Sequence, residues 1–161
     1  MATSCFPEYE YVSLEETENR NFSKRTIKSP KLYFHDTGLA AHLLGIRTDE
    51  QLYTHTSRGA LFENLIVAEA VKAYTHHRRE PPIYFWRDQT GHELDLLIED
   101  ADLLYPVEIK SGATVGASMF DNLKWWNRLA GNPAGNATLI YGGDHCFAQN
   151  EINVRPWYSI G

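Results

Sequence analysis

The order of hydrophobic patterns in the sequence predicts an α/β domain. A helical pattern over residues 59–74 is followed by a series of three strand-like runs. A second helical pattern, over residues 117–129, then leads to a short apolar run at residues 137–143. A strand that returns through a helical crossover lies parallel to its predecessor, so we expect the fourth strand to be parallel to the third.

Length and composition are those of one folded domain. The chain has 161 residues, of which 43% are hydrophobic and 12% aromatic, enough for a single core. Residues 1–23 are polar and acidic with little periodicity, and we expect a flexible tail or the remnant of a preceding module there. We therefore assign the folded domain to residues 24–161 and its core to about residues 59–158.

Charge limits the partners that the whole molecule can attract. The formal net charge of −6 provides no global attraction for nucleic acid. One segment is locally basic, and its cations are Lys24, Arg25, Lys28 and Lys31. It is either a solvated linker or a phosphate contact.

The sequence indicates a cytoplasmic protein without a membrane partner. Cys5 and Cys146 lie far apart and outside any metal-binding spacing, which is typical of a reducing compartment. The N-terminus lacks the apolar region of a signal peptide, and no apolar run reaches the length of a membrane span. No pattern specifies an oligomeric state.

A short strand and a short helix are expected before the first long helical pattern. Leu32 and Phe34 indicate the strand, and Asp36 or the threonine after it can cap a helix that ends at Gly45. Residues 48–58 are expected to be a connection. The helix over residues 59–74 then follows, with apolar residues at helical spacing.

Turn residues separate the three strand-like runs. The runs are IYFWR from Ile83, ELDLLIE from Glu93 and LLYPVEIK from Leu103. DQTG and DAD lie between them, and both are typical of turns. Together with residues 137–143 and a last run near the C-terminus, they predict a mixed central sheet of four to five strands.

The register of the second hairpin decides which charged residues share a face. If its turn centres on residues 101 and 102, Asp95 lies opposite Glu108, and Lys110 follows two residues later on the same face. A three-residue turn would place Asp95 and Glu108 on opposite faces.

Two carboxylates on one face need compensation. At about 4 Å and an effective dielectric constant near 20 they repel by roughly 4 kcal/mol, so a shared proton, Lys110 or a divalent cation must offset the repulsion. Because Mg²⁺ prefers carboxylate oxygens and keeps several waters, Asp95 and Glu108 indicate a hydrated magnesium site. Glu63, near the start of the helix, is either a third ligand or an acid that favours the helix dipole.

These residues predict metal-assisted hydrolysis of a phosphodiester bond. Asp95 and Glu108 would hold the cation, which polarises a phosphate oxygen and lowers the pKa of a bound water. Lys110 would orient that water or help to deprotonate it, and would offset charge on the phosphate. An isolated D…ExK pattern is weak, because a solvated ion pair worth less than about 1 kcal/mol explains it equally well. The helix before it and the crossover after it favour a site.

The ordered motifs resemble a known family. The ordered motifs are similar to the domain that follows the ATPase module in prokaryotic AAA-type ATP-binding proteins. The motifs are KSPKLYFHDTGLAAHLLGI, GALFENLIVAEAVKAY, YFWRDQTGHELDLLIE and VEIKSG. That domain is in turn similar to the PD-(D/E)xK, or restriction-endonuclease-like, nuclease superfamily. The resemblance implies a three-layer α/β/α fold with the core order αβββαβ. It also implies a Mg²⁺- or Mn²⁺-dependent nuclease acting on DNA, with Glu63 and Asp95 as acids and Glu108 and Lys110 as the E-x-K pair. Leu94 replaces the proline of the motif name.

The resemblance also concerns partners. An ATP-binding module precedes this domain in the family, but the sequence holds no GxxxxGK[ST] motif, so we expect no ATP hydrolysis by this chain. Arg87 and Lys124 are further candidates for phosphate contacts. The competing interpretation is a non-catalytic DNA-binding or protein-docking module on the same fold.

Overall fold

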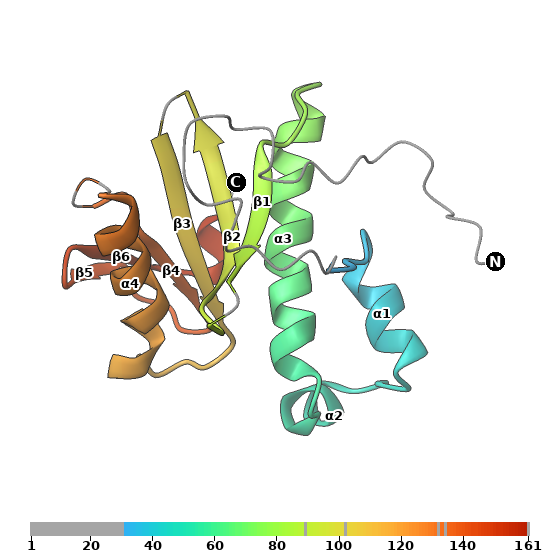
Figure 1. Ribbon diagram of the computed structural model, residues 1–161. Coiled ribbons are helices and arrows are strands. Elements are labelled where there is room, and N and C mark those ends of the chain that lie inside the picture. The colour runs from blue at the N-terminus through green and yellow to red at the C-terminus, as the bar shows by residue number, and fades with distance from the viewer. Residues whose placement is uncertain (1–30, 89, 102, 132, 134, 161) are drawn as a thin grey trace.

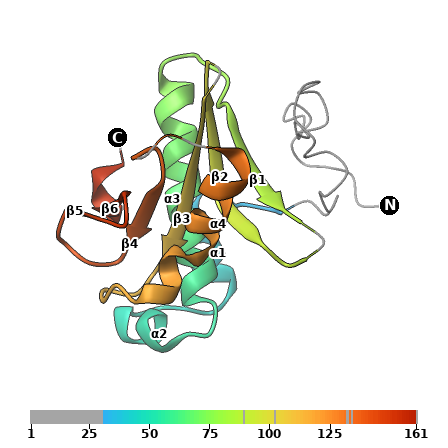
Figure 2. The same ribbon diagram turned by 60° about the vertical axis from the view of Figure 1, so that its left-hand side comes forward.

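A six-stranded mixed sheet forms the centre of the molecule, with one long helix on each face (Figure 1). The computed structural model describes residues 31–88, 90–101, 103–131, 133 and 135–160. Helix α3 (Arg58–His76) covers one face of the sheet, and α4 (Asp121–Ala130) covers the other. The turned view in Figure 2 shows the sheet between these two helices. The expected α/β class and the two long helices are confirmed.

The strand order in the sheet is β1-β2-β3-β4-β6-β5. The strands are β1 (Ile83–Arg87), β2 (Glu93–Asp100), β3 (Leu103–Lys110), β4 (Thr138–Tyr141), β5 (Phe147–Gln149) and β6 (Ile152–Pro156). Strand β4 is parallel to β3, as expected, and β6 is parallel to β4. The other neighbouring strands are antiparallel.

The expected number of strands, four to five, was too low. The additional strand is β5, a three-residue edge strand that pairs with β6. All of its side chains are exposed, so the segment lacks the alternation by which a strand is recognised in a sequence.

The β2–β3 hairpin has the register of a turn centred on residues 101 and 102, and its regular pairing ends one residue short of Asp95 and Glu108. Asp100 pairs with Leu103, and the pairing continues without a shift to Leu96 and Val107. Ala101, at the tip, adopts the left-handed conformation with φ of +53°, as two-residue hairpin turns require. The three-residue turn is therefore excluded.

Alternation along β2 and β3 divides the core between the two faces. Leu96, Val107 and Ile109 pack with Ile66 of α3 and its neighbours. On the opposite face, Leu97, Leu104 and Leu139 pack with apolar residues of α4. Both tryptophans of α4 belong to this second cluster. Trp126 is fully buried in it, and Trp125 is partly buried and packs against the cluster. Each helix thus binds one face of the hairpin that carries the charged residues.

Two short helices precede α3. Helix α1 (Thr37–Leu43) begins after Asp36, whose carboxylate accepts a hydrogen bond from the amide of Leu39 at 3.0 Å. Helix α2 (Asp49–Thr54) lies where we expected a connection. Thr48 and Gln51 form a capping box at its start, and this T-x-x-Q pattern is a signal that sequence reasoning could have used.

The strand expected around Leu32 and Phe34 does not form. Instead, the backbone of Phe34 bonds the side chain of Asn64 in α3. Its N–H donates to Asn64 Oδ1 at 2.6 Å, and its carbonyl accepts from Asn64 Nδ2 at 2.8 Å. The segment therefore satisfies its backbone groups with a helix side chain, not with a neighbouring strand.

We expect Gly142→Ala to destabilise the protein by roughly 1–3 kcal/mol. A Cβ atom at Gly142 would lie 2.5 Å from the carbonyl oxygen of Ser111, just after the end of β3. Gly116→Ala is the matched control, because nothing lies within 4 Å of a Cβ atom there. Urea unfolding of the two variants measures the difference, and equal stabilities would contradict the close approach of the loop after β3 to the end of β4.

Candidate active site

The β2–β3 ladder ends just before Asp95 and Glu108. Beyond its last pair, the N–H of Ile109 donates to the Asp95 carboxylate, with 2.8 Å between the nitrogen and Oδ2. A side chain of β2 thus replaces a backbone carbonyl as the acceptor. Asp95, which is only 7% exposed, thus links the two strands at this point.

Lys110 lies between the two carboxylates. Its Nζ is 2.6 Å from Glu108 Oε1 and 3.4 Å from Asp95 Oδ2. Asn122 of α4 also donates to Glu108 Oε1, at 3.3 Å. The structure therefore brings together Asp95, Glu108 and Lys110, the three residues that the sequence predicted on one face.

One oxygen of Glu108 is buried and unpaired among the residues that the structure describes. Glu108 is 3% exposed, and its Oε2 is buried without a hydrogen bond among the described residues. An unsatisfied carboxylate oxygen is costly in a protein interior. This atom is therefore an acceptor of the site that no described side chain or backbone group occupies.

Burial and like charge raise the pKa values of both acids. Desolvation, reinforced by the charge of Asp95, raises the pKa of Glu108 to about 7. Desolvation also raises the pKa of Asp95, although the charge of Lys110 opposes this. Burial alone would lower the pKa of Lys110, but the charges of Asp95 and Glu108 raise it overall. Lys110 therefore keeps its proton at neutral pH.

Glu63 lies in the second turn of α3, because the helix begins at Arg58. The dipole effect is confined to the first turn, so the structure gives little weight to that alternative. Glu63 Oε1 instead accepts hydrogen bonds from the Tyr33 hydroxyl at 2.6 Å and from Lys31 Nζ at 2.9 Å. Burial and the hydrogen bond to Glu63 raise the pKa of Tyr33 well above its usual range.

Lys31 lies among acids, although the sequence indicated it as a possible phosphate contact. Its Nζ forms ion pairs with Glu63 and Glu93 and lies 3.9 Å from Asp95 Oδ1. Sequence reasoning missed Glu93, although it precedes Asp95 by two residues on the same strand and both contact Lys31. That spacing was the available signal.

The other two predicted phosphate contacts that the structure describes, Arg87 and Lys124, lie in different surroundings. Arg87 Nε lies 3.6 Å from Glu93 Oε2, at the edge of the acid group. Lys124 Nζ lies over the ring of Phe120, 5.6 Å from its centroid. Lys24, Arg25 and Lys28 are outside the described residues, as are residues 1–23.

A metal ion would have to be held mainly by Asp95 and Glu108. Within the described parts of the chain, no group of three or more histidine, cysteine, aspartate or glutamate side chains is arranged to hold a metal. Two carboxylates nevertheless meet the needs of Mg²⁺, which keeps several waters and takes one or two protein carboxylates.

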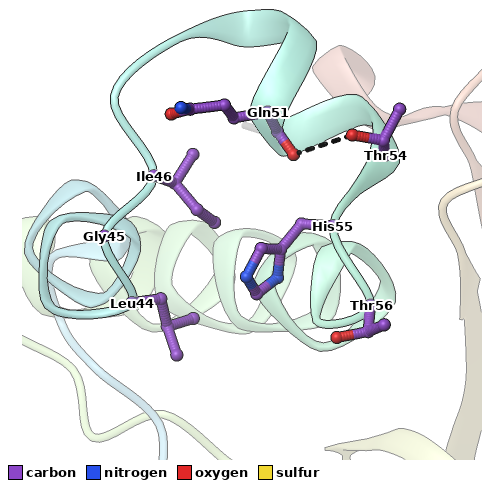
Figure 3. Close-up of a pocket in the computed structure, with 7 residues that line it drawn as sticks. All are labelled: Leu44, Gly45, Ile46, Gln51, Thr54, His55 and Thr56. Carbon is purple, nitrogen blue, oxygen red and sulfur yellow. Dashed lines mark hydrogen bonds between the residues drawn. The ribbon is translucent and has the colours of Figure 1, made fainter.

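A separate pocket lies between α1 and α2 (Figure 3). Its volume is about 420 Å³. The residues that line it are Leu44, Gly45, Ile46, Gln51, Thr54, His55 and Thr56. His55 is its single titratable side chain, and none of the acids of the candidate site borders it. The pocket therefore offers no acid–base pair for chemistry.

Comparison with known proteins now places the chain. A family model described as a domain of unknown function, DUF4143, matches residues 58–160. The chain belongs to the DUF4143 family. The match extends from the first residue of α3 to the last described residue and so contains every strand of this DUF4143 domain. A second model of a domain of unknown function, DUF8612, matches residues 11–50, which include Lys31.

The relatives of this DUF4143 chain are much longer than it is. An uncharacterized protein of Mycobacterium bovis and one of Mycobacterium tuberculosis are each 32% identical to it over 134 residues. The matched region is 83% of this chain but 29% of each relative. No solved structure is significantly similar to the chain. None of the helices in the described ranges combines the length and apolar character that a membrane crossing requires.

We expect Glu108→Gln to change how stability depends on pH. The pKa of Glu108 is about 7 in the folded protein, against an ordinary value of 4.5, so the folded state binds the proton more tightly than the unfolded state. The stability that this group contributes is then fully present below about pH 4.5 and is lost as pH rises through about 7, a change of roughly 3 kcal/mol.

The measurement is urea unfolding in EDTA at about pH 5 and about pH 8. Glu108→Gln removes the titrating group, so its stability should fall less between these two values than that of the wild type. Glu69→Gln, on the exposed side of α3, is the control and should follow the wild type. Parallel pH dependences for wild type and Glu108→Gln would show that burial does not raise this pKa.

Proposed function

We propose that this DUF4143 domain is a divalent-metal-dependent nuclease that hydrolyses DNA phosphodiester bonds, on a PD-(D/E)xK fold. The observation that carries the proposal is that Asp95 and Glu108 both lie against Lys110 Nζ, just beyond the last pair of the β2–β3 ladder. The order of α3, three antiparallel strands, α4 and a strand parallel to the third supports the same assignment.

The donor set fits a divalent ion. Asp95 and Glu108 would hold it, because both carboxylates lie against the same lysine and Glu108 Oε2 has no partner in the described residues. When bound, such an ion supplies Lewis-acid chemistry, polarising a phosphate oxygen and lowering the pKa of a water.

The side chains of the chain itself would bind and orient the reacting groups. Lys110 keeps its proton, so its Nζ can donate to a phosphate oxygen or to the attacking water and offset negative charge as it develops. The Ile109 amide fixes the orientation of Asp95, and Asn122 fixes that of Glu108. The residues of the sheet edge would thus position a water against the phosphate.

The partners proposed are DNA and an ATPase module. The resemblance to domains that follow AAA-type ATPases accords with the greater length of the mycobacterial relatives. We assign ATP hydrolysis to such a module and none to this chain, whose sequence has no P-loop motif.

A non-catalytic docking module on the same fold is the second candidate. The observation that favours it is that Lys31 and Lys110 already neutralise part of the charge of the acids. Buried acids that are paired with lysines can persist for structural reasons alone.

Plasmid cleavage tests the proposed function. Supercoiled plasmid with Mg²⁺ or Mn²⁺ should be nicked by the wild type, and Asp95→Asn and Lys110→Met should each lower the rate by roughly 100-fold or more. Lys72→Met is the matched control, since Lys72 pairs with Glu69 on α3, away from the acids. Equal cleavage by all four proteins would indicate a contaminant, and absence of cleavage by the wild type would favour the docking module.

A further inference from the structure

Lys31 is a cation from outside the central fold that lies inside the candidate site. We infer that Lys31 acts as a tethered counter-cation, which neutralises Glu63, Glu93 and Asp95 and competes with a divalent ion for these carboxylates. The inference rests on the proposed function only in that it concerns the same acids. It assigns to Lys31 a regulatory contact that limits the affinity of the site for metal.

The Lys31 side chain contacts three acidic side chains and one aromatic ring. Its Nζ is 2.9 Å from Glu63 Oε1 and 3.9 Å from Asp95 Oδ1, and it forms an ion pair with Glu93. The ring of Phe85 lies beneath it, with 5.8 Å between Nζ and the ring centroid. Burial alone would lower the pKa of Lys31, but its bonds to Glu93 and Glu63 raise it, so the side chain stays charged.

Asp95 links this lysine to the rest of the site. Its Oδ1 faces Lys31, and its Oδ2 accepts from Lys110 at 3.4 Å. Both oxygens of Asp95 are thus already facing ammonium groups. A divalent ion that approaches Oδ1 would meet the positive charge of Lys31, and this repulsion opposes binding unless Lys31 moves.

The position of Lys31 is set by the segment that carries it. Asn64, only 6% exposed, bonds both backbone groups of Phe34 and the hydroxyl of Thr37 at 2.8 Å. Tyr33 bonds Glu63 at 2.6 Å. These bonds attach the residues that follow Lys31 to α3. The more exposed pair of Lys72 and Glu69 is by contrast a local contact within one helix.

The test compares Mn²⁺ binding by the wild type and by Lys31→Met. The methionine side chain is similar in length to that of lysine but carries no charge. Without metal, the melting temperature of Lys31→Met should be lower, because the acids lose a partner. Its affinity for Mn²⁺, measured by calorimetry and by the rise in melting temperature, should be higher by roughly tenfold. Lys72→Met is the control and should match the wild type in Mn²⁺ affinity.

A second variant protects the test if Lys31→Met does not fold. Tyr33→Phe keeps every charge but removes the hydroxyl that anchors the segment to Glu63. It should raise Mn²⁺ affinity by a smaller factor than Lys31→Met. Unchanged or weaker Mn²⁺ binding in the folded variants overturns the inference, as does the absence of saturable Mn²⁺ binding in all of the proteins.

These outcomes are separate from those of the cleavage experiment. Tighter Mn²⁺ binding by Lys31→Met with no plasmid cleavage would support the counter-cation and reject the nuclease. Plasmid cleavage that depends on Asp95, with equal Mn²⁺ affinities in wild type and Lys31→Met, would support the nuclease and reject the counter-cation.

Discussion

The hydrogen bond from the Ile109 amide to the Asp95 carboxylate is the contact on which the candidate site depends. It occupies the place of the next rung of the β2–β3 ladder. A carbonyl at this point would continue the ladder, whereas the Asp95 side chain links the two strands beyond its last regular pair. Lys110 and Glu108 follow there, with Glu108 Oε2 unpaired among the described residues. Because a charged side chain takes the place of a backbone carbonyl as acceptor, the residue that ends the ladder also carries charge in the candidate site.

The two faces of the sheet explain why these charges can remain buried. Strands β2 and β3 are packed by α3 on one side and α4 on the other. The apolar packing of a domain contributes far more free energy than the repulsion between a few acids costs. The net stability is the small difference between such opposing contributions, and the packing can therefore offset this repulsion. Asn122 from α4 and Lys31 from the segment before α1 then supply polar partners from both sides.

Local patterns in the sequence were sufficient to predict the centre of the fold and three residues of the site. Asp95, Glu108 and Lys110 come from one hairpin, and its turn fixes their register. Short elements were missed, because no residue of α2 or β5 is fully buried, and neither element shows a periodic apolar pattern. The partnership of Lys31 with Glu63 could not be predicted either, since 32 residues separate them and only the tertiary fold brings them together.

The contact between Lys31 and α3 crosses the boundary between two matched families. The acids lie within residues 58–160, which match one family, but Lys31 lies within residues 11–50, which match the other. A fragment cut to the first of these regions would keep all four carboxylates of the site and lose one of the two lysines that neutralise them. The unit that sets the charge of this site is therefore larger than the domain that its sequence family defines.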